Sequence, residues 1–294
     1  MVYNGGNFYT CLTGMPVSEP IRSSRPGTMT VFIMVHFALT AIVNLVFFAG
    51  NAFRPLASAT GGVFTGSLIV NVIFLVIIVG GVMFIRGGLR LYDVGLIMRR
   101  LGGGVVFTLA FWGAAQLVHL LAGLLYRGYV AFSPALNDPG FMIGLVLAQI
   151  FGNALFEEIA YRGFLFPQLY LWLGERQRNP WKRLGLALLI SQGAFALSHI
   201  PNRIYLGMTP DAIAFDLLLL LTWGVFYTII YLRTDNLFVV VGAHAMGNVP
   251  TTLFATAPGL EGNGEAVLIY AMIIVAMFLY PMFRPQRQKR LVAA

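Results

Sequence analysis

The sequence predicts an all-α, polytopic integral membrane protein with about eight transmembrane helices. Of its 294 residues, 58% are hydrophobic and only 10% are charged, whereas soluble domains carry about 25% charged residues. Apolar stretches of roughly 20 residues, the length that crosses a bilayer, recur along the chain. The short segments between them hold most of the Arg, Lys, Pro and Gly residues. The apolar stretches therefore need a lipid bilayer as their surroundings.

The apolar stretches define eight spans in one membrane domain, residues 29–283. Residues 1–28 contain no compact apolar core that ends in a small-residue cleavage site, so we expect the first span to insert without cleavage. Residues 284–294 form a basic tail. The predicted spans are residues 29–50, 63–86, 103–126, 140–166, 184–201, 212–232, 237–256 and 265–283.

Basic residues between the spans predict the orientation. With the N-terminus in the cytoplasm, three basic residues lie outside: Arg54, Arg127 and Arg203. Fifteen lie inside: Arg22, Arg25, Arg86, Arg90, Arg99, Arg100, Arg176, Arg178, Lys182, Arg183, Arg233, Arg284, Arg287, Lys289 and Arg290. An excess of Lys and Arg in cytoplasmic loops is typical of membrane proteins. We therefore expect both termini in the cytoplasm, and we attribute the net charge of +8 to topology rather than to nucleic-acid binding.

Two further features are the single cysteine and the segment after the fourth span. The single cysteine, Cys11, can form no intrachain disulfide and suits neither a metal site nor a nucleophile. Residues 167–183 mix aromatic and basic side chains after Pro167. We interpret them as a basic loop with aromatic anchors; an interfacial helix or an extension of the fourth span is the alternative.

Three charged residues interrupt the fourth predicted span: Glu157, Glu158 and Arg162. A charged side chain at membrane depth costs at least about 2.5–3.5 kcal/mol, so such residues persist where they pair or line a wet cavity. The four-residue spacing of Glu158 and Arg162 places them on one helix face as an ion pair. Glu157 lies about 100° away around the helix, so its carboxylate is available to take a proton from water. A purely structural ionic lock is the alternative.

Polar side chains also occur in two later spans. His199 lies near the end of the fifth span, and His244 and Asn248 are four residues apart in the seventh, so they project from the same side. Small residues around His244 permit close helix approach, and interhelical hydrogen bonding is the structural alternative. His36 and His119 have no acidic neighbour or four-spaced polar partner, and we interpret both as structural.

The ordered motifs EExxxR, FxxxH and HxxxN resemble those of the CAAX prenyl protease and bacteriocin-processing family of intramembrane endopeptidases. They begin at Glu157, Phe195 and His244, and the resemblance covers about residues 140–256. It implies a glutamate-dependent protease in which Glu157 activates water with help from His199, while His244 and Asn248 stabilise the oxyanion. Glu158 and Arg162 would support this site. The resemblance implies no cofactor and a peptide or protein substrate, which in some family members is lipid-modified.

Elementary chemistry agrees with this assignment, because amide hydrolysis needs a base for water, donors for the oxyanion and a proton for the leaving amine. Two carboxylates and two histidines are also good zinc ligands, so a zinc-dependent protease built from the same residues is one alternative. A non-catalytic scaffold or a transporter with an intramembrane proton relay is the other.

The predicted spans leave one conflict of depth. Glu157 lies towards the cytoplasmic end of the fourth span, whereas His199 lies near the outer end of the fifth. The two side chains must meet for catalysis. We therefore expect either that the fourth helix extends through about residue 174 or that the fifth begins late, after a re-entrant loop.

Overall fold

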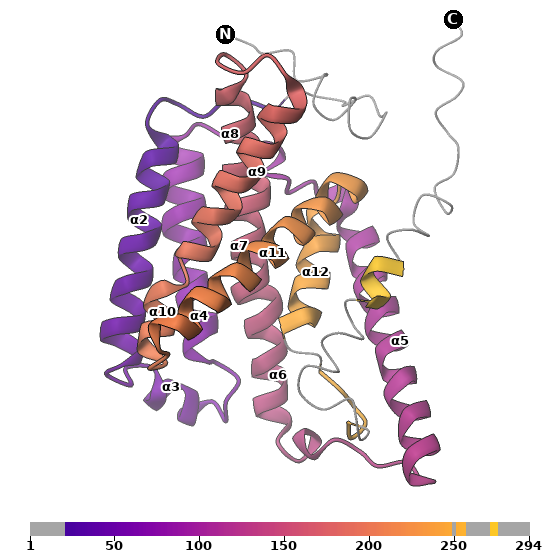
Figure 1. Cartoon of the computed structure of the whole chain (residues 1–294). Coiled ribbons are helices and arrows are strands. Elements are labelled where there is room, and N and C mark those ends of the chain that lie inside the picture. Colours follow the sequence, from indigo (N-terminus) through magenta and orange to yellow (C-terminus); the bar gives the residue numbers. More distant parts are fainter. Residues whose placement is uncertain (1–20, 249–250, 257–270, 276–294) are drawn as a thin grey trace, which may run out of the picture.

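A computed structural model describes residues 21–248, 251–256 and 271–275 of the chain (Figure 1). These residues contain helices and no strand. The α-helices are α2 (Thr28–Ile42), α3 (Arg54–Ala59), α4 (Gly66–Phe74), α5 (Leu101–Arg127), α6 (Pro139–Leu147), α7 (Leu155–Glu157), α8 (Phe166–Leu173), α9 (Pro180–Leu197), α10 (Ile200–Tyr205), α11 (Pro210–Thr234) and α12 (Leu237–Asn248).

Four π-helical and three 3₁₀ segments complete the helical structure. The π-helical segments, in which the turns are wider, are η1 (Val43–Phe48), η2 (Leu75–Arg86), η6 (Ala148–Ala154) and η7 (Glu158–Leu165). The 3₁₀ segments are η3 (Tyr92–Val94), η4 (Met98–Arg100) and η5 (Pro134–Asn137). The π-helical segments continue α-helices without a break, so the transmembrane units are longer than the individual elements.

Within the described residues, six continuous helices are long and apolar enough to cross a membrane, which confirms the polytopic all-α fold. They are Thr28–Phe48, Gly66–Arg86, Met98–Arg127, Pro139–Leu173, Pro180–Tyr205 and Pro210–Thr234. The shorter apolar helix α12 follows them. The predicted eighth span, residues 265–283, lies outside the described residues except for the helical residues 271–275, and so do most of the N-terminal segment and the whole C-terminal tail.

The predicted seventh span is too long. Helix α12 has 12 residues and ends at Asn248 rather than at residue 256. With a rise of 1.5 Å per residue it is about 18 Å long, well short of a hydrocarbon core of about 30 Å. Residues 251–256 follow it without helical structure.

The fourth helix, Pro139–Leu173, is 35 residues long and resolves the conflict of depth. It includes residues 167–173 of the segment 167–183 that we interpreted as a basic loop, and residues 180–183 begin α9, so that interpretation was wrong and the extension was correct. Only residues 174–179 connect it to the fifth helix, Pro180–Tyr205. Glu157 consequently lies near the middle of the fourth helix, at the level that His199 reaches.

Local sequence explains where these helices begin. Asp138, Asn179 and Thr209 precede α6, α9 and α11, and each side chain accepts a hydrogen bond from a backbone N–H of the first helical turn. Each cap is followed by proline, whose fixed φ angle suits the first turn and whose missing N–H is not needed there. Thr65 caps α4 in the same way.

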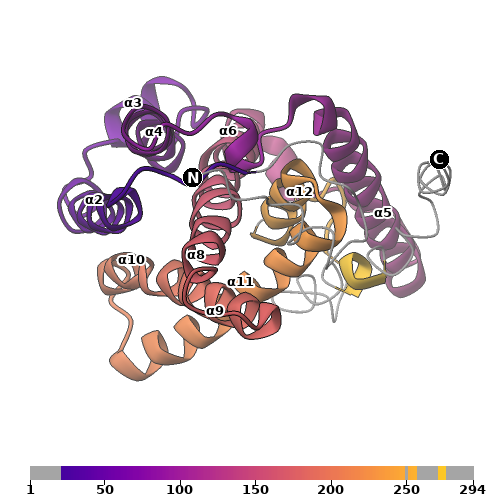
Figure 2. The ribbon, with the colours of Figure 1, turned by 90° about the horizontal axis from the view of Figure 1, so that it is seen from above.

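Helix α12 is enclosed by other helices. It packs against α5, α11 and the middle of the fourth helix, and Figure 2 shows it inside the ring that they form. Two glycines permit the contact with α5: a Cβ atom on Gly242 would collide with Thr108, and one on Gly104 would collide with Phe238. Gly242, one of the small residues near His244, therefore allows α12 to approach α5 closely.

Candidate active site

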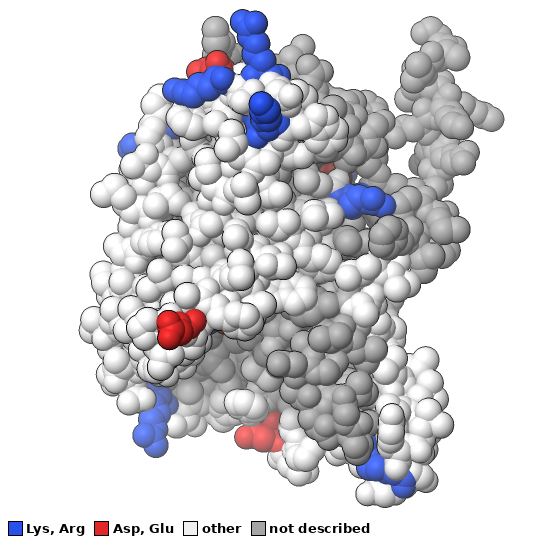
Figure 3. All heavy atoms as spheres, viewed as in Figure 1, with Lys and Arg blue, Asp and Glu red and all other residues white. Residues whose placement is uncertain are grey.

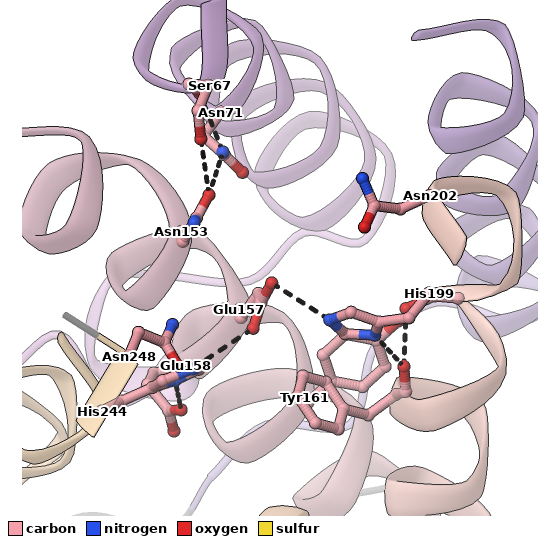
Figure 4. A network of polar contacts seen from close by, with 12 residues as sticks. Ser67, Asn71, Asn153, Glu157, Glu158, Tyr161, His199, Asn202, His244 and Asn248 are labelled. Atoms are coloured by element: carbon pink, nitrogen blue, oxygen red, sulfur yellow. Dashed lines mark hydrogen bonds and ion pairs between the residues drawn. The ribbon is translucent and has the colours of Figure 1, made fainter. Parts of the chain in front are cut away.

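Three parts of the fold bring the predicted site residues together (Figure 4). Glu157 ends α7 and lies between the π-helical segments η6 and η7. His199 lies at the junction of α9 and α10, and His244 and Asn248 lie on α12. π-helical turns within α-helices are rare and are frequent at functional sites. Here they flank the glutamate directly.

The Glu157 carboxylate faces both histidines. Its Oε1 atom lies 3.7 Å from His199 Nε2, and its Oε2 atom lies 3.6 Å from His244 Nε2. The side chains of Glu157 and His199 are each 19% exposed, whereas that of His244 is 4% exposed. The carboxylate is therefore partly accessible at the point where it meets two nitrogen atoms that accept or donate protons.

Hydrogen bonds on the far side of each ring orient the two histidines. His199 Nδ1 lies 2.9 Å from the Phe195 carbonyl oxygen. Because a carbonyl only accepts hydrogen bonds, Nδ1 carries the proton and Nε2 faces Glu157. His244 Nδ1 lies 2.6 Å from Glu158 Oε1, and its Nε2 likewise faces Glu157. A backbone oxygen and a carboxylate thus fix the two rings in matching orientations.

Glu158 and Arg162 form a fully buried ion pair behind His244. Arg162 Nη1 lies 3.1 Å from Glu158 Oε1, and both side chains are 0% exposed. Arg162 also donates to the Gly224 carbonyl oxygen at 3.3 Å and lies 4.5 Å from the centre of the Phe195 ring. The pair contacts His244 rather than Glu157, so any support that it gives to the base acts through that histidine.

Two aromatic contacts hold the rings from the side. Tyr227 stacks on His244 with 4.6 Å between ring centres and an angle of 19°. Phe195 packs edge-on against His199 at 4.8 Å. These contacts leave each imidazole little freedom to turn away from Glu157.

Asn248 lies one helical turn beyond His244, as the spacing predicted, and is exposed to the same cavity. Its side-chain nitrogen donates to Gln149 Oε1 at 3.3 Å. The amide nitrogen carries a second N–H, which is a hydrogen-bond donor in the cavity that Glu157 also lines.

The site lines a cavity of about 450 Å³ that includes polar residues the charge-based argument missed. On its wall, Asn153 Oδ1 accepts hydrogen bonds from Ser67 at 2.9 Å and from Asn71 at 2.7 Å. Asn202 donates to Asn44 at 2.9 Å. Uncharged amides within apolar spans are the signal that could have identified these residues, since buried amides need partners as charges do.

The remaining histidines are placed differently from the site pair. His36 is buried and lines the cavity, and its Nδ1 atom lies 2.9 Å from the Tyr161 hydroxyl. It thus contacts the cavity wall, which its sequence context did not indicate. His119 is buried on α5 and does not line the cavity.

The arrangement of the ionisable side chains also concerns the alternative of a zinc-dependent protease. Within the part of the chain that the structure describes, no group of three or more His, Cys, Asp or Glu side chains is arranged to hold a metal ion. Metal independence stays a prediction, to be tested on purified protein.

Comparison with known proteins adds a family match across this site. Residues 139–250 match the family model described as Rce1-like, type II CAAX prenyl endopeptidase. This match supports the resemblance to the CAAX prenyl protease and bacteriocin-processing family. The match covers the fourth helix through α12 and so includes every predicted site residue, which supports CAAX-type intramembrane protease activity. Searches of curated proteins and of solved structures return no match.

Part of the cavity wall lies outside the residues that match the family model. Helices α2 and α4 lie outside the matched residues, yet His36, Ser67 and Asn71 from these helices line the cavity. The first spans thus carry no family motif but do shape the site.

Proposed function

We propose that this chain is an intramembrane endopeptidase in which Glu157 activates water for attack on a peptide bond. The observation that carries the proposal is the pairing of one partly exposed carboxylate with two imidazole nitrogens, at 3.6 and 3.7 Å, in a polar cavity. A general base needs this combination of access to water and oriented partners.

In the proposed reaction, Glu157 removes a proton from water as its oxygen attacks the scissile carbonyl carbon. The carbonyl oxygen becomes an oxyanion. The proton taken by Glu157 then passes to the leaving amine, directly or through His199 Nε2, and the C–N bond breaks. General acid–base catalysis of this kind contributes about 10²–10⁴-fold to a rate.

The oxyanion needs hydrogen-bond donors at the position where charge develops. The Asn248 amide lies on the cavity, and His244 directs Nε2 into it. With a proton on Nε2, His244 donates to the oxyanion alongside Asn248. One such donor contributes about 10²–10³-fold to catalysis in proteases.

The proposed substrate is a peptide or protein segment that enters the cavity from the membrane. The family description identifies a first candidate, a C-terminal tail with a prenylated cysteine. We propose a metal-free reaction; stoichiometric zinc in the purified active protein, with loss of activity on chelation, would favour the zinc-dependent alternative instead.

Glu157→Gln tests the proposal, because it keeps the shape of the side chain and removes the base. Peptides released in membranes that contain the wild-type chain are compared by mass spectrometry with those from the variant. Glu175→Gln, an acid outside the site cavity, is the matched control. We expect a set of fragments to disappear only in Glu157→Gln while the protein still folds. Fragments released equally by all three proteins would refute the proposal and favour a scaffold or transporter.

A further inference from the structure

The site cavity occupies one half of the molecule. Its lining residues come from the middle of the helices and from the half nearer the end at which α3 and α10 lie (Figure 1). On α2 and η1 they run from His36 towards Phe48, and on α4 they begin at Ser67. The later helices contribute Gln149, Asn153, Phe156 and Glu157 of the fourth, Phe195, Ser198, His199, Asn202 and Arg203 of the fifth, and Leu220 of α11.

Bulky side chains close the cavity towards the opposite end. Tyr161, Phe164 and Phe166 follow Glu157 along the fourth helix and are each 0% exposed. A separate hollow at that end is lined by residues such as Arg25 and Trp172 and shares no residue with the site cavity. No described residue of the site cavity comes from there.

The open end continues to the surface. A second hollow is lined by Phe48, Ser67 and Asn202, which also line the site cavity, and it reaches Ala57 on α3 and Tyr205 at the end of α10. His199 lies six residues before Tyr205, about 9 Å along the helix. An extended segment of about three residues would cross that depth.

Basic residues mark the two ends of the molecule unequally. Figure 3 shows Lys and Arg gathered mainly at the end where α8 and α9 meet, opposite the cavity mouth. Apart from the buried Arg162, the described basic residues lie near the ends of the spans or between them, and among these only Arg54, Arg127 and Arg203 lie at the mouth end. Those at the closed end are Arg22, Arg25, Arg86, Arg90, Arg99, Arg100, Arg176, Arg178, Lys182, Arg183 and Arg233. By the positive-inside rule, the closed end faces the cytoplasm.

We infer that the cavity opens on the side of the membrane away from the cytoplasm, so that the chain cleaves peptide segments presented at the extracytoplasmic surface or in the outer leaflet. The inference rests on the proposed function for cleavage itself. Its substrates are then exported or membrane-embedded polypeptides with an extended stretch of at least about three residues. This orientation excludes the cytoplasmic prenylated tail that the family description offers as a first candidate, and labelling of the closed end alone would restore that candidate.

Cysteine accessibility tests the orientation independently of proteolysis. The native Cys11 is replaced by serine, and single cysteines are introduced at the mouth (Ala57→Cys, Tyr205→Cys) or at the closed end (Arg178→Cys, Trp181→Cys). Bacterial spheroplasts that express the full chain are treated with a membrane-impermeant polyethylene glycol maleimide, which adds mass visible on a gel. We expect labelling at the mouth only, and at all four positions after detergent solubilisation. Labelling of the closed end alone would overturn the inference.

A second pair of variants tests whether the cavity itself is reached from that side. Val43 lines the cavity and Val79 does not, although both are buried. A small, charged, impermeant thiosulfonate added to intact spheroplasts should react with Val43→Cys and not with Val79→Cys. Equal protection of both cysteines would contradict an outward-opening cavity. Neither experiment depends on activity, so a wrong orientation and a wrong catalytic assignment give different results.

Discussion

The buried pair Glu158–Arg162 should be the most costly polar contact in the chain to break on one side. Both side chains are 0% exposed and their charged atoms lie 3.1 Å apart. Arg162→Met removes the cation and leaves the Glu158 carboxylate buried, with His244 as its remaining partner among the described residues. Breaking a buried ion pair in this way costs about 3–5 kcal/mol, chiefly because a buried charge loses its compensation.

Arg203→Met is the matched control. Arg203 pairs with Asp216 at 2.7 Å, but these side chains are 19% and 26% exposed. Solvent screens such a pair, so its loss should cost about 0–1 kcal/mol. The free energy of unfolding is measured for both variants in mixed micelles by titration with a denaturing detergent, followed by circular dichroism.

A double-mutant cycle completes the test. Glu158→Gln combined with Arg162→Met removes both charges, so the double variant should lose less stability than the sum of the two single changes. Equal and small losses for Arg162→Met and Arg203→Met would refute the reasoning, since burial would then make no difference to the pair. Additive losses in the cycle would show that the two charges do not compensate one another.

Three further changes probe the donor, the cavity wall and the helix contact. Asn248→Ala should lower kcat about 10²–10³-fold in a peptide-cleavage assay while the free energy of unfolding stays at the wild-type value; unchanged kcat would remove the residue from the oxyanion site. Asn153→Ala takes the shared acceptor from two side chains of α4 and should cost about 1–3 kcal/mol in detergent unfolding, whereas a neutral effect would mean that the amide network is dispensable. Gly242→Ala should destabilise the α5–α12 contact by about 1–3 kcal/mol, whereas Gly102→Ala, where a Cβ atom meets nothing within 4 Å, should be neutral or stabilising; similar effects at both glycines would contradict the close approach.

The sequence predicted which polar residues lie together better than it predicted the ends of the helices. Charge inside an apolar span is expensive wherever the span begins, so Glu157, Glu158 and Arg162 were recognisable without exact boundaries. The structure places Glu157 beside His199 and His244, and their catalytic roles stay predictions. The fourth helix was predicted too short because Pro167 reads as a helix break. The helix nevertheless continues through that proline, and the π-helical segment η7 ends two residues before it.

Tertiary contacts explain what the sequence did not indicate. The bond between Ser67 and Asn153 joins residues 86 positions apart, and the bond between Asn44 and Asn202 joins residues 158 apart. Neither the hydrophobic periodicity of one helix nor the spacing of residues within it can predict pairs that are so far apart in the sequence. The contact of His36 with Tyr161 was missed for the same reason, since its partner lies on another helix.

The rate of peptide cleavage by purified Glu157→Gln tests the central claim most directly. The protein is reconstituted in lipid nanodiscs, and cleavage of a peptide taken from the wild-type-dependent fragments is followed over time. We predict that kcat falls by about 10²–10⁴-fold relative to the wild-type chain, while Glu175→Gln keeps the wild-type rate and both variants unfold at the wild-type detergent concentration. Cleavage by Glu157→Gln at the wild-type rate would contradict the account.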